Sequence, residues 1–100
     1  MVRRPFQHLQ AESRNLSNLL YHTYHTAGYI RLIMNYSDLS PFYHNLNILH
    51  NYCAHIWNTF SPILDDLIRR EQIEANRLNL PPEDRINEHP HQFLRGPNEW

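Results

Sequence analysis

The histidines of this chain, eight in 100 residues, invite a chemical interpretation, because imidazole binds metals and transfers protons near neutral pH. Six of them occur as three close pairs: His22 and His25, His50 and His55, and His89 and His91. A structural zinc site needs about four convergent ligands, yet the chain has one cysteine and lacks H-E-x-x-H and paired C-x-x-C spacings. The sequence therefore predicts no metal site and no cofactor, with the histidines serving as amphipathic surface residues.

Catalytic groups are equally sparse. Cys53 is the only thiol, and its place in an apolar repeat predicts a buried, inert side chain. Two glycines are too few for a glycine-rich phosphate loop. The adjacent Asp65 and Asp66 point to different faces of a helix and precede Arg69 and Arg70 by four residues, which suits charge pairing better than acid–base catalysis. We therefore expect a protein that is not an enzyme.

All nine basic residues are arginine, which is unusual because lysine is among the commonest residues. Three explanations remain open. The composition can be drift in a short chain, the result of a reading frame that overlaps another gene, or selection against ubiquitin attachment, which needs a lysine amine. The last two are typical of a small viral accessory protein or a short-lived regulatory protein.

A long first helix is predicted over residues 5–35, with Pro5 in the first turn, where its missing N–H costs nothing. Two neighbouring heptad lines form its apolar face. They are Leu9, Leu16, Thr23 and Ile30 at position a, and Phe6, Ser13, Leu20, Ala27 and Met34 at position e. Such a broad stripe is typical of a helix that packs on a core. Gly28 inside the helix predicts a bend or a close contact.

A second helix is predicted to begin at Ser40-Pro41, a serine cap followed by a first-turn proline, and to end near Leu78. Its apolar residues alternate by four and three: Phe42, Leu46, Leu49, Cys53, Ile56, Phe60, Ile63 and Leu67. A neighbouring e line widens this seam: Tyr43, His50, Trp57 and Leu64. Ser61-Pro62 repeats the start signal. Because the seam keeps its phase there, we expect a kink or a nearly collinear restart.

These elements predict an all-α fold, either a helical hairpin or a three-helix bundle. Residues 1–79 would form the helical domain, and the proline-rich residues 80–100 an extended or disordered tail. The seam is too wide for one small chain to cover, which predicts a homodimer. The residues assigned to this oligomer or core seam are Leu46, Leu49, Ile56, Phe60 and Ile63.

The leading functional hypothesis is a non-enzymatic protein-interaction module, of viral accessory or regulatory character, that binds itself and a host or partner protein. Tyr43 and Trp57 would form its partner-binding ridge, since these types are enriched at interface centres, although core packing accounts for Trp57 equally well. A single cysteine, no signal-peptide core and no apolar run of membrane-spanning length predict a cytoplasmic or nuclear protein with no membrane partner.

The alternative hypothesis is a double-stranded RNA-binding dimer, of the kind found among suppressors of RNA silencing. The outer face of the first helix carries no acid, and residues 1–50 hold four arginines against Glu12 and Asp38. Such a face follows phosphates by shape and contacts 2′-hydroxyls through polar side chains. The residues assigned to RNA are Arg3, Arg4, Arg14, Tyr24, His25 and Arg31.

Overall fold

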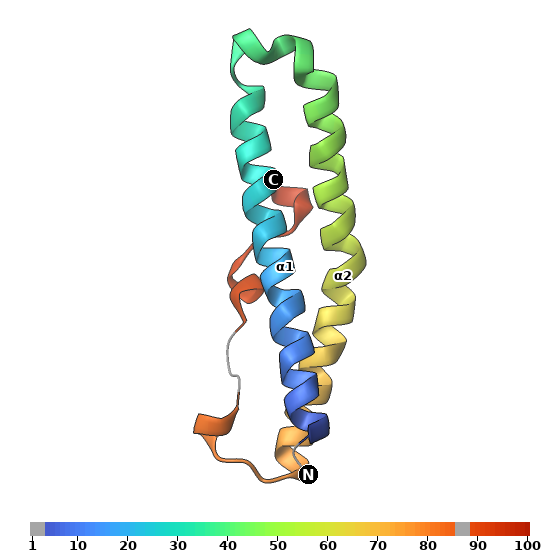
Figure 1. The fold of residues 1–100 in the computed structure, drawn as a ribbon, viewed down its shortest axis with the longest axis vertical. Coiled ribbons are helices and arrows are strands. Elements are labelled where there is room, and N and C mark those ends of the chain that lie inside the picture. Colours follow the sequence, from blue (N-terminus) through green and yellow to red (C-terminus); the bar gives the residue numbers. More distant parts are fainter. Residues whose placement is uncertain (1–3, 86–88) are drawn as a thin grey trace.

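The computed structural model describes residues 4–85 and 89–100, apart from the side chains of Arg4 and Pro5. Two long helices, α1 (Arg4–Met34) and α2 (Tyr43–Arg77), lie side by side and antiparallel, as Figure 1 shows. The molecule is elongated, with extents of 57 × 21 × 20 Å. The predicted all-α class and helical hairpin are confirmed. No helix in the described ranges is long and apolar enough to cross a membrane.

The turn between the helices differs from the prediction. Ser40 and Pro41 lie inside a 3₁₀ helix, η1 (Ser37–Phe42), and α2 begins at Tyr43 without a side-chain cap. The Tyr43 N–H instead donates to the Ser40 carbonyl, an i to i−3 bond that continues the tighter turn into α2. The serine–proline signal therefore marks the approach to α2 and not its first residue.

Helix α2 runs unbroken through Pro62 and then ends in a well-defined motif. Asn79 adopts a left-handed φ of 56°, which asparagine tolerates better than most residues. The Asn79 and Leu80 N–H groups donate to the Asn76 and Ala75 carbonyls, each at 3.1 Å, which is the Schellman pattern. Leu80 is buried against Ala75, so this helix end directs the chain back onto the hairpin.

The core is a single line of contacts along the hairpin. Its central cluster consists of Leu20, Trp57, Leu64 and Ile68. Flanking clusters at the two ends consist of Phe6, Ala75 and Leu80, and of Ala27, Ile30 and Cys53. The e lines of both helices supply half of these residues, including Leu20, Trp57 and Leu64 of the central cluster, so the two e lines face each other. Small side chains at Ser13 and Ser17, both fully buried, contribute to the same face of α1.

The predicted close contact at Gly28 is not present. A Cβ atom there would meet nothing within 4 Å, and the residue is exposed. Its place on the outer side of α1 explains this, because the hairpin packs only through the opposite side of the helix.

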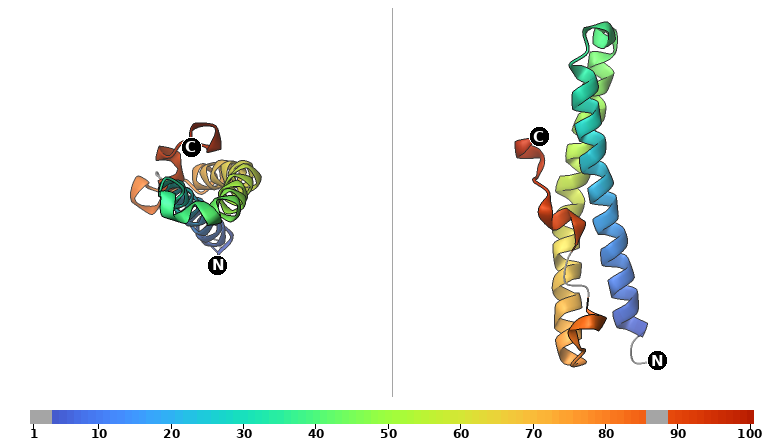
Figure 2. Two further views of the ribbon diagram at one scale, coloured as in Figure 1. Left: turned by 90° about the horizontal axis from the view of Figure 1, so that it is seen from above. Right: turned by 90° about the vertical axis from the view of Figure 1, so that its left-hand side faces the viewer.

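The described part of the tail lies against the hairpin. It contains three short 3₁₀ helices, η2 (Pro82–Asp84), η3 (Pro90–Phe93) and η4 (Pro97–Glu99), and Leu94 after η3 is extended. Figure 2 shows residues 89–100 along one face of the two helices. Contacts of η3 with α1 and of η4 with α2 hold them there, so the prolines prevent long helices but not docking.

Candidate interaction surfaces

An aromatic cluster joins the end of the tail to both helices. Trp57 of α2 is 6% exposed, and its ring lies 5.9 Å from that of Trp100 and 6.4 Å from that of Tyr24. Trp100 and Tyr24 are 6.1 Å apart, and the Trp100 indole N–H donates to the Arg95 carbonyl at 2.8 Å. At these separations the rings contact one another directly, so no ligand group fits between them.

Trp57, one of the two residues of the predicted partner-binding ridge, therefore belongs to the core of the hairpin in this structure. The tail covers it from outside, since a Cβ on Gly96 would lie 3.4 Å from the indole nitrogen. Tyr43, the other ridge residue, is exposed near the start of α2. The two residues are two heptads apart on the same e line, and only the one beneath the tail is buried.

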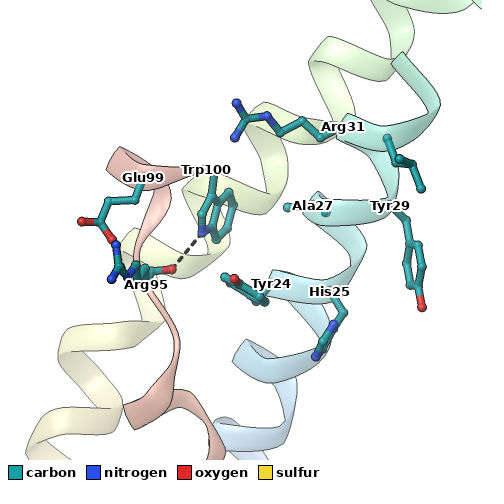
Figure 3. Close-up of a pocket in the computed structure, with 10 residues that line it drawn as sticks. Tyr24, His25, Ala27, Tyr29, Arg31, Arg95, Glu99 and Trp100 are labelled. Carbon is teal, nitrogen blue, oxygen red and sulfur yellow. Dashed lines mark hydrogen bonds and ion pairs between the residues drawn. The ribbon is translucent and has the colours of Figure 1, made fainter. Parts of the chain in front are cut away.

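A pocket of about 410 Å³ lies between α1 and the last residues of the tail, as Figure 3 shows. Trp100 and Tyr24 form one wall, while Tyr29 points away from them. Arg31 lines the pocket and takes part in no ion pair among the described residues, whereas Arg95 pairs with Glu99 at 3.3 Å. The pocket thus combines an aromatic wall with one guanidinium that remains available to an anion.

The residues assigned to RNA are divided by the fold. Tyr24, His25 and Arg31 line this pocket. Arg14 is exposed farther along α1, in a separate pocket that Glu83 and Asp84 of the tail also line. Arg3 and the side chain of Arg4 lie outside the described residues. The face of α1 that is free of acids in sequence therefore meets two tail acids beside Arg14.

The predicted seam of α2 is divided between core and surface. Leu46 and Phe60 are half-buried and pack against the core clusters. Ile56 is half-buried as well, whereas Leu49 and Ile63 are 50% and 48% exposed. Trp57 and Leu64, one position farther along, take the buried places. The structure thus leaves Leu49, Ile56 and Ile63 as an apolar stripe, seven residues apart, on the flank of α2.

Helix geometry shows that this stripe and the tail occupy opposite faces of the hairpin. Successive residues turn by about 100°, so Ile56 lies roughly 100° to one side of Trp57, and Asp65 roughly 80° to the other. Asp65 contacts His91 of the tail. On α1, Leu19 and Ile33 lie on the same side as the stripe, and both are partly exposed. We call the surface made by these residues the open face: Leu19, Ile33, Leu49, Ile56 and Ile63.

A buried polar cluster lies beneath the tail. The Ser13 hydroxyl of α1 donates to Glu71 Oε2 of α2 at 2.7 Å, and His89 Nε2 lies 3.8 Å from the same oxygen. The backbone N–H of His91 donates to Ser17 Oγ at 3.5 Å, and the imidazole Nε2 of His91 lies 3.6 Å from Asp65 Oδ1. Polar groups of both helices and the tail therefore meet in one place.

Burial lowers the pKa of His89, with the carboxylate of Glu71 opposing that shift and Arg14 reinforcing it. Burial also lowers the pKa of His91, against the hydrogen bond and charge of Asp65. A lowered pKa in each ring favours the neutral imidazole in the docked tail. The sequence predicts surface positions for the histidines, and nothing in the spacing of His89 and His91 indicates that helices far away in the sequence cover these two rings.

Metal ligands and the one thiol are the remaining candidates for chemistry. Among the residues in the described ranges, no group of three or more His, Cys, Asp or Glu side chains is placed to hold a metal ion. Cys53 is buried in the core, and burial raises the pKa of its thiol, which disfavours the reactive thiolate.

Comparison with known proteins adds no family to this description. No protein-family model matches the chain, and neither a curated protein sequence nor a solved structure does. The surfaces of the hairpin and its tail are therefore the guide to its function.

Proposed function

We propose that this protein is a non-enzymatic helical interaction module that forms a homodimer through its open face. The observation that carries the proposal is the exposure of Leu49 and Ile63 at heptad spacing on the flank that the tail leaves uncovered. Isolated apolar residues on a surface need no explanation, but a row of them along two adjacent helices is typical of an interface.

A second copy of the chain suits this surface in both length and spacing. The core pairs Phe6 with Ala75, and Ala27 with Cys53, which places Leu19 level with Ile63 and Ile33 level with Leu49. The apolar residues thus form two rungs that a twofold axis would bring against an identical pair. Two hairpins joined in this way make a four-helix bundle, with the tails on its outside.

The test is a double substitution, Leu49→Asp with Ile63→Asp, studied by sedimentation and circular dichroism. Because both side chains are half exposed, we expect helicity to be retained while the dimer dissociates. Ile48→Asp is the control, since this residue is exposed about 180° around α2 from the buried Trp57. Wild-type protein that sediments as a monomer at tens of micromolar, or a control variant that dissociates the dimer equally, would contradict the proposal.

A viral accessory or regulatory role, exerted on a host or partner protein in the cytoplasm or nucleus, is the biological setting we favour. Its support is compositional: the chain contains no lysine and its one thiol is buried and unpaired. A chain without lysine offers ubiquitin no side-chain amine. A cellular half-life that is unchanged by exposed lysines, introduced at Arg69 and Arg70, would argue against selection of this kind.

Duplex RNA binding is the second candidate, and the pocket at Trp100 is the observation in its favour, because it brings Tyr24, His25 and Arg31 together. Arg14→Glu with Arg31→Glu should then abolish a gel shift of duplex RNA without changing the circular dichroism. Phosphate neutralisation releases counterions, so the affinity should fall steeply with salt. Arg69→Glu with Arg70→Glu on α2 is the control. A shift that survives the first pair, or that is insensitive to salt, would count against this function.

A further inference from the structure

The two tail histidines form the junction between residues 89–100 and the hairpin. His89 and His91 are only 2% and 7% exposed, although both belong to a segment that lies on the surface of two long helices. They flank Pro90 at the start of η3, the tail element in contact with α1. Docking of the tail therefore requires both imidazoles to leave water.

The docked site accommodates neutral imidazoles better than charged ones. An imidazolium has two N–H donors and needs an acceptor for each. Among the described residues, His89 Nε2 and His91 Nδ1 have no hydrogen-bond partner, and Glu71 Oε2 is 3.8 Å from the first of them. A charge added to either ring would be buried with incomplete pairing, which is costly.

We propose that His89 and His91 form a proton-controlled latch, which holds residues 89–100 on the hairpin while both rings are neutral and releases them when the rings are protonated. The latch is independent of the proposed dimer, because the tail and the open face lie on opposite sides of the hairpin.

The charged groups around the two rings come from every element packed on them. Helix α1 contributes Arg14, which repels a proton on His89, and α2 contributes Glu71 and Asp65, which attract protons. Asp65 is largely exposed, so water screens its charge, and burial outweighs both acids. A proton on one ring also disfavours a proton on the other, since the charge of His89 lowers the pKa of His91.

The sign of the pH dependence follows from these directions. In the released tail each histidine has its ordinary pKa, about 6.5, while in the docked tail the pKa is lower. The released state therefore binds more protons, and docking weakens as the pH falls below about 6.5. With two rings, the ratio of docked to released tail falls by up to about 100-fold per pH unit until the docked rings titrate as well.

Release would change the surface of the hairpin. Leu94 and Trp100 pack on the central cluster that contains Leu20, Trp57 and Leu64. When the tail leaves, this cluster loses its cover and a second apolar face becomes available beside the aromatic residues. Acidification would thus convert a hairpin with one apolar face into a hairpin with two.

The test follows Trp57 emission in a Trp100→Phe background from pH 7.5 to 5. We expect a red shift that begins near pH 6.5, with helical circular dichroism unchanged. His89→Gln with His91→Gln should remove the pH dependence, whereas the control pair His44→Gln with His55→Gln, exposed on α2 and outside the pocket at the tail, should retain it. Emission independent of pH in the parent, or a transition of the same size in the His89 and His91 variant, would refute the latch.

An NMR titration of the wild-type imidazoles decides the question without any variant, which matters if glutamine at these positions undocks the tail at every pH. We expect His89 and His91 to titrate below the ordinary pKa of histidine, about 6.5, while the tail is docked. Titration of His89 and His91 at or above that value would overturn the proposal, because protonation would then not weaken docking.

Discussion

The Ser13 hydroxyl of α1 donates a hydrogen bond of 2.7 Å to the Glu71 carboxylate of α2, and both side chains are buried. This bond crosses the hairpin in the middle of an apolar contact line, where a carboxylate is expensive unless it is hydrogen-bonded. Ser13→Ala removes the donor and leaves the acid, so we expect a loss of about 1–3 kcal/mol in the free energy of unfolding. Urea denaturation measures the loss, and Ser37→Ala, at an exposed site in η1, should change the stability little. Equal effects of the two substitutions would show that the bond contributes nothing.

Leucine-to-alanine substitutions on α2 should show by their effect on stability that the e line, which contains Leu64, is the core, and that the seam residue Leu49 is not. Leu64 is fully buried in the central cluster, so Leu64→Ala should cost about 2–5 kcal/mol through lost burial and the cavity left behind. Leu49 is half exposed, and Leu49→Ala should cost less than about 1.5 kcal/mol in the monomer. The comparison needs protein dilute enough to be monomeric. An equal loss of unfolding free energy in Leu49→Ala and Leu64→Ala would show that the e line of α2 does not form the core.

Pro62 lies inside α2, where it removes one backbone hydrogen bond and crowds the preceding turn. Its side chain is exposed, so replacement costs little packing. We expect Pro62→Ala to stabilise the protein by about 1–3 kcal/mol, measured as a higher urea midpoint with an unchanged slope. A destabilised Pro62→Ala protein would indicate that the proline sets a bend that the hairpin requires.

Gly28 offers a smaller gain of the same kind. Its helical position is exposed, and an added Cβ meets no atom within 4 Å. Gly28→Ala should therefore raise the free energy of unfolding by about 1 kcal/mol, because alanine restricts the unfolded chain and favours the helix. Thermal unfolding measures this gain. A lower melting temperature would instead point to a need for glycine at the pocket that this residue lines.

Trp100 anchors the far end of the tail through ring contacts with Tyr24, His50 and Trp57. Trp100→Ala should loosen the last residues of the tail while the hairpin remains helical. Hydrogen exchange should then be faster at the amides of residues 94–100 and little changed within α1 and α2. Phe93→Ala is the control, because Phe93 is exposed and belongs to the same segment. Equal acceleration by both variants would show that the tryptophan is no specific anchor.

The sequence by itself determined the elements of this protein. Apolar periodicity, together with Pro5, Pro41 and the proline-rich residues 80–100, located both helices to within a few residues and set off the tail, because a 3.6-residue period reflects local geometry alone. Periodicity also showed that each helix has two adjacent apolar lines, as in Ile56 beside Trp57 and Ile63 beside Leu64 of α2. It gave no means of choosing between the lines, since either one forms an acceptable core.

Tertiary structure made that choice and placed the polar groups. Packing α1 against α2 buries Leu64 and leaves Ile63 on the open face, because one partner helix contacts only part of a wide apolar stripe. The tail then returns to cover one flank and carries His89 to Glu71. No local sequence pattern predicts the contact between His89 and Glu71. It depends on the path of the chain after the turn at Asn79 and on the burial of His89 against the two helices. The sequence thus determined which residues form helices. The packing of α1, α2 and residues 89–100 decided which apolar side chains are buried and which remain exposed. The same packing buried His89 and His91, where protonation is unfavourable.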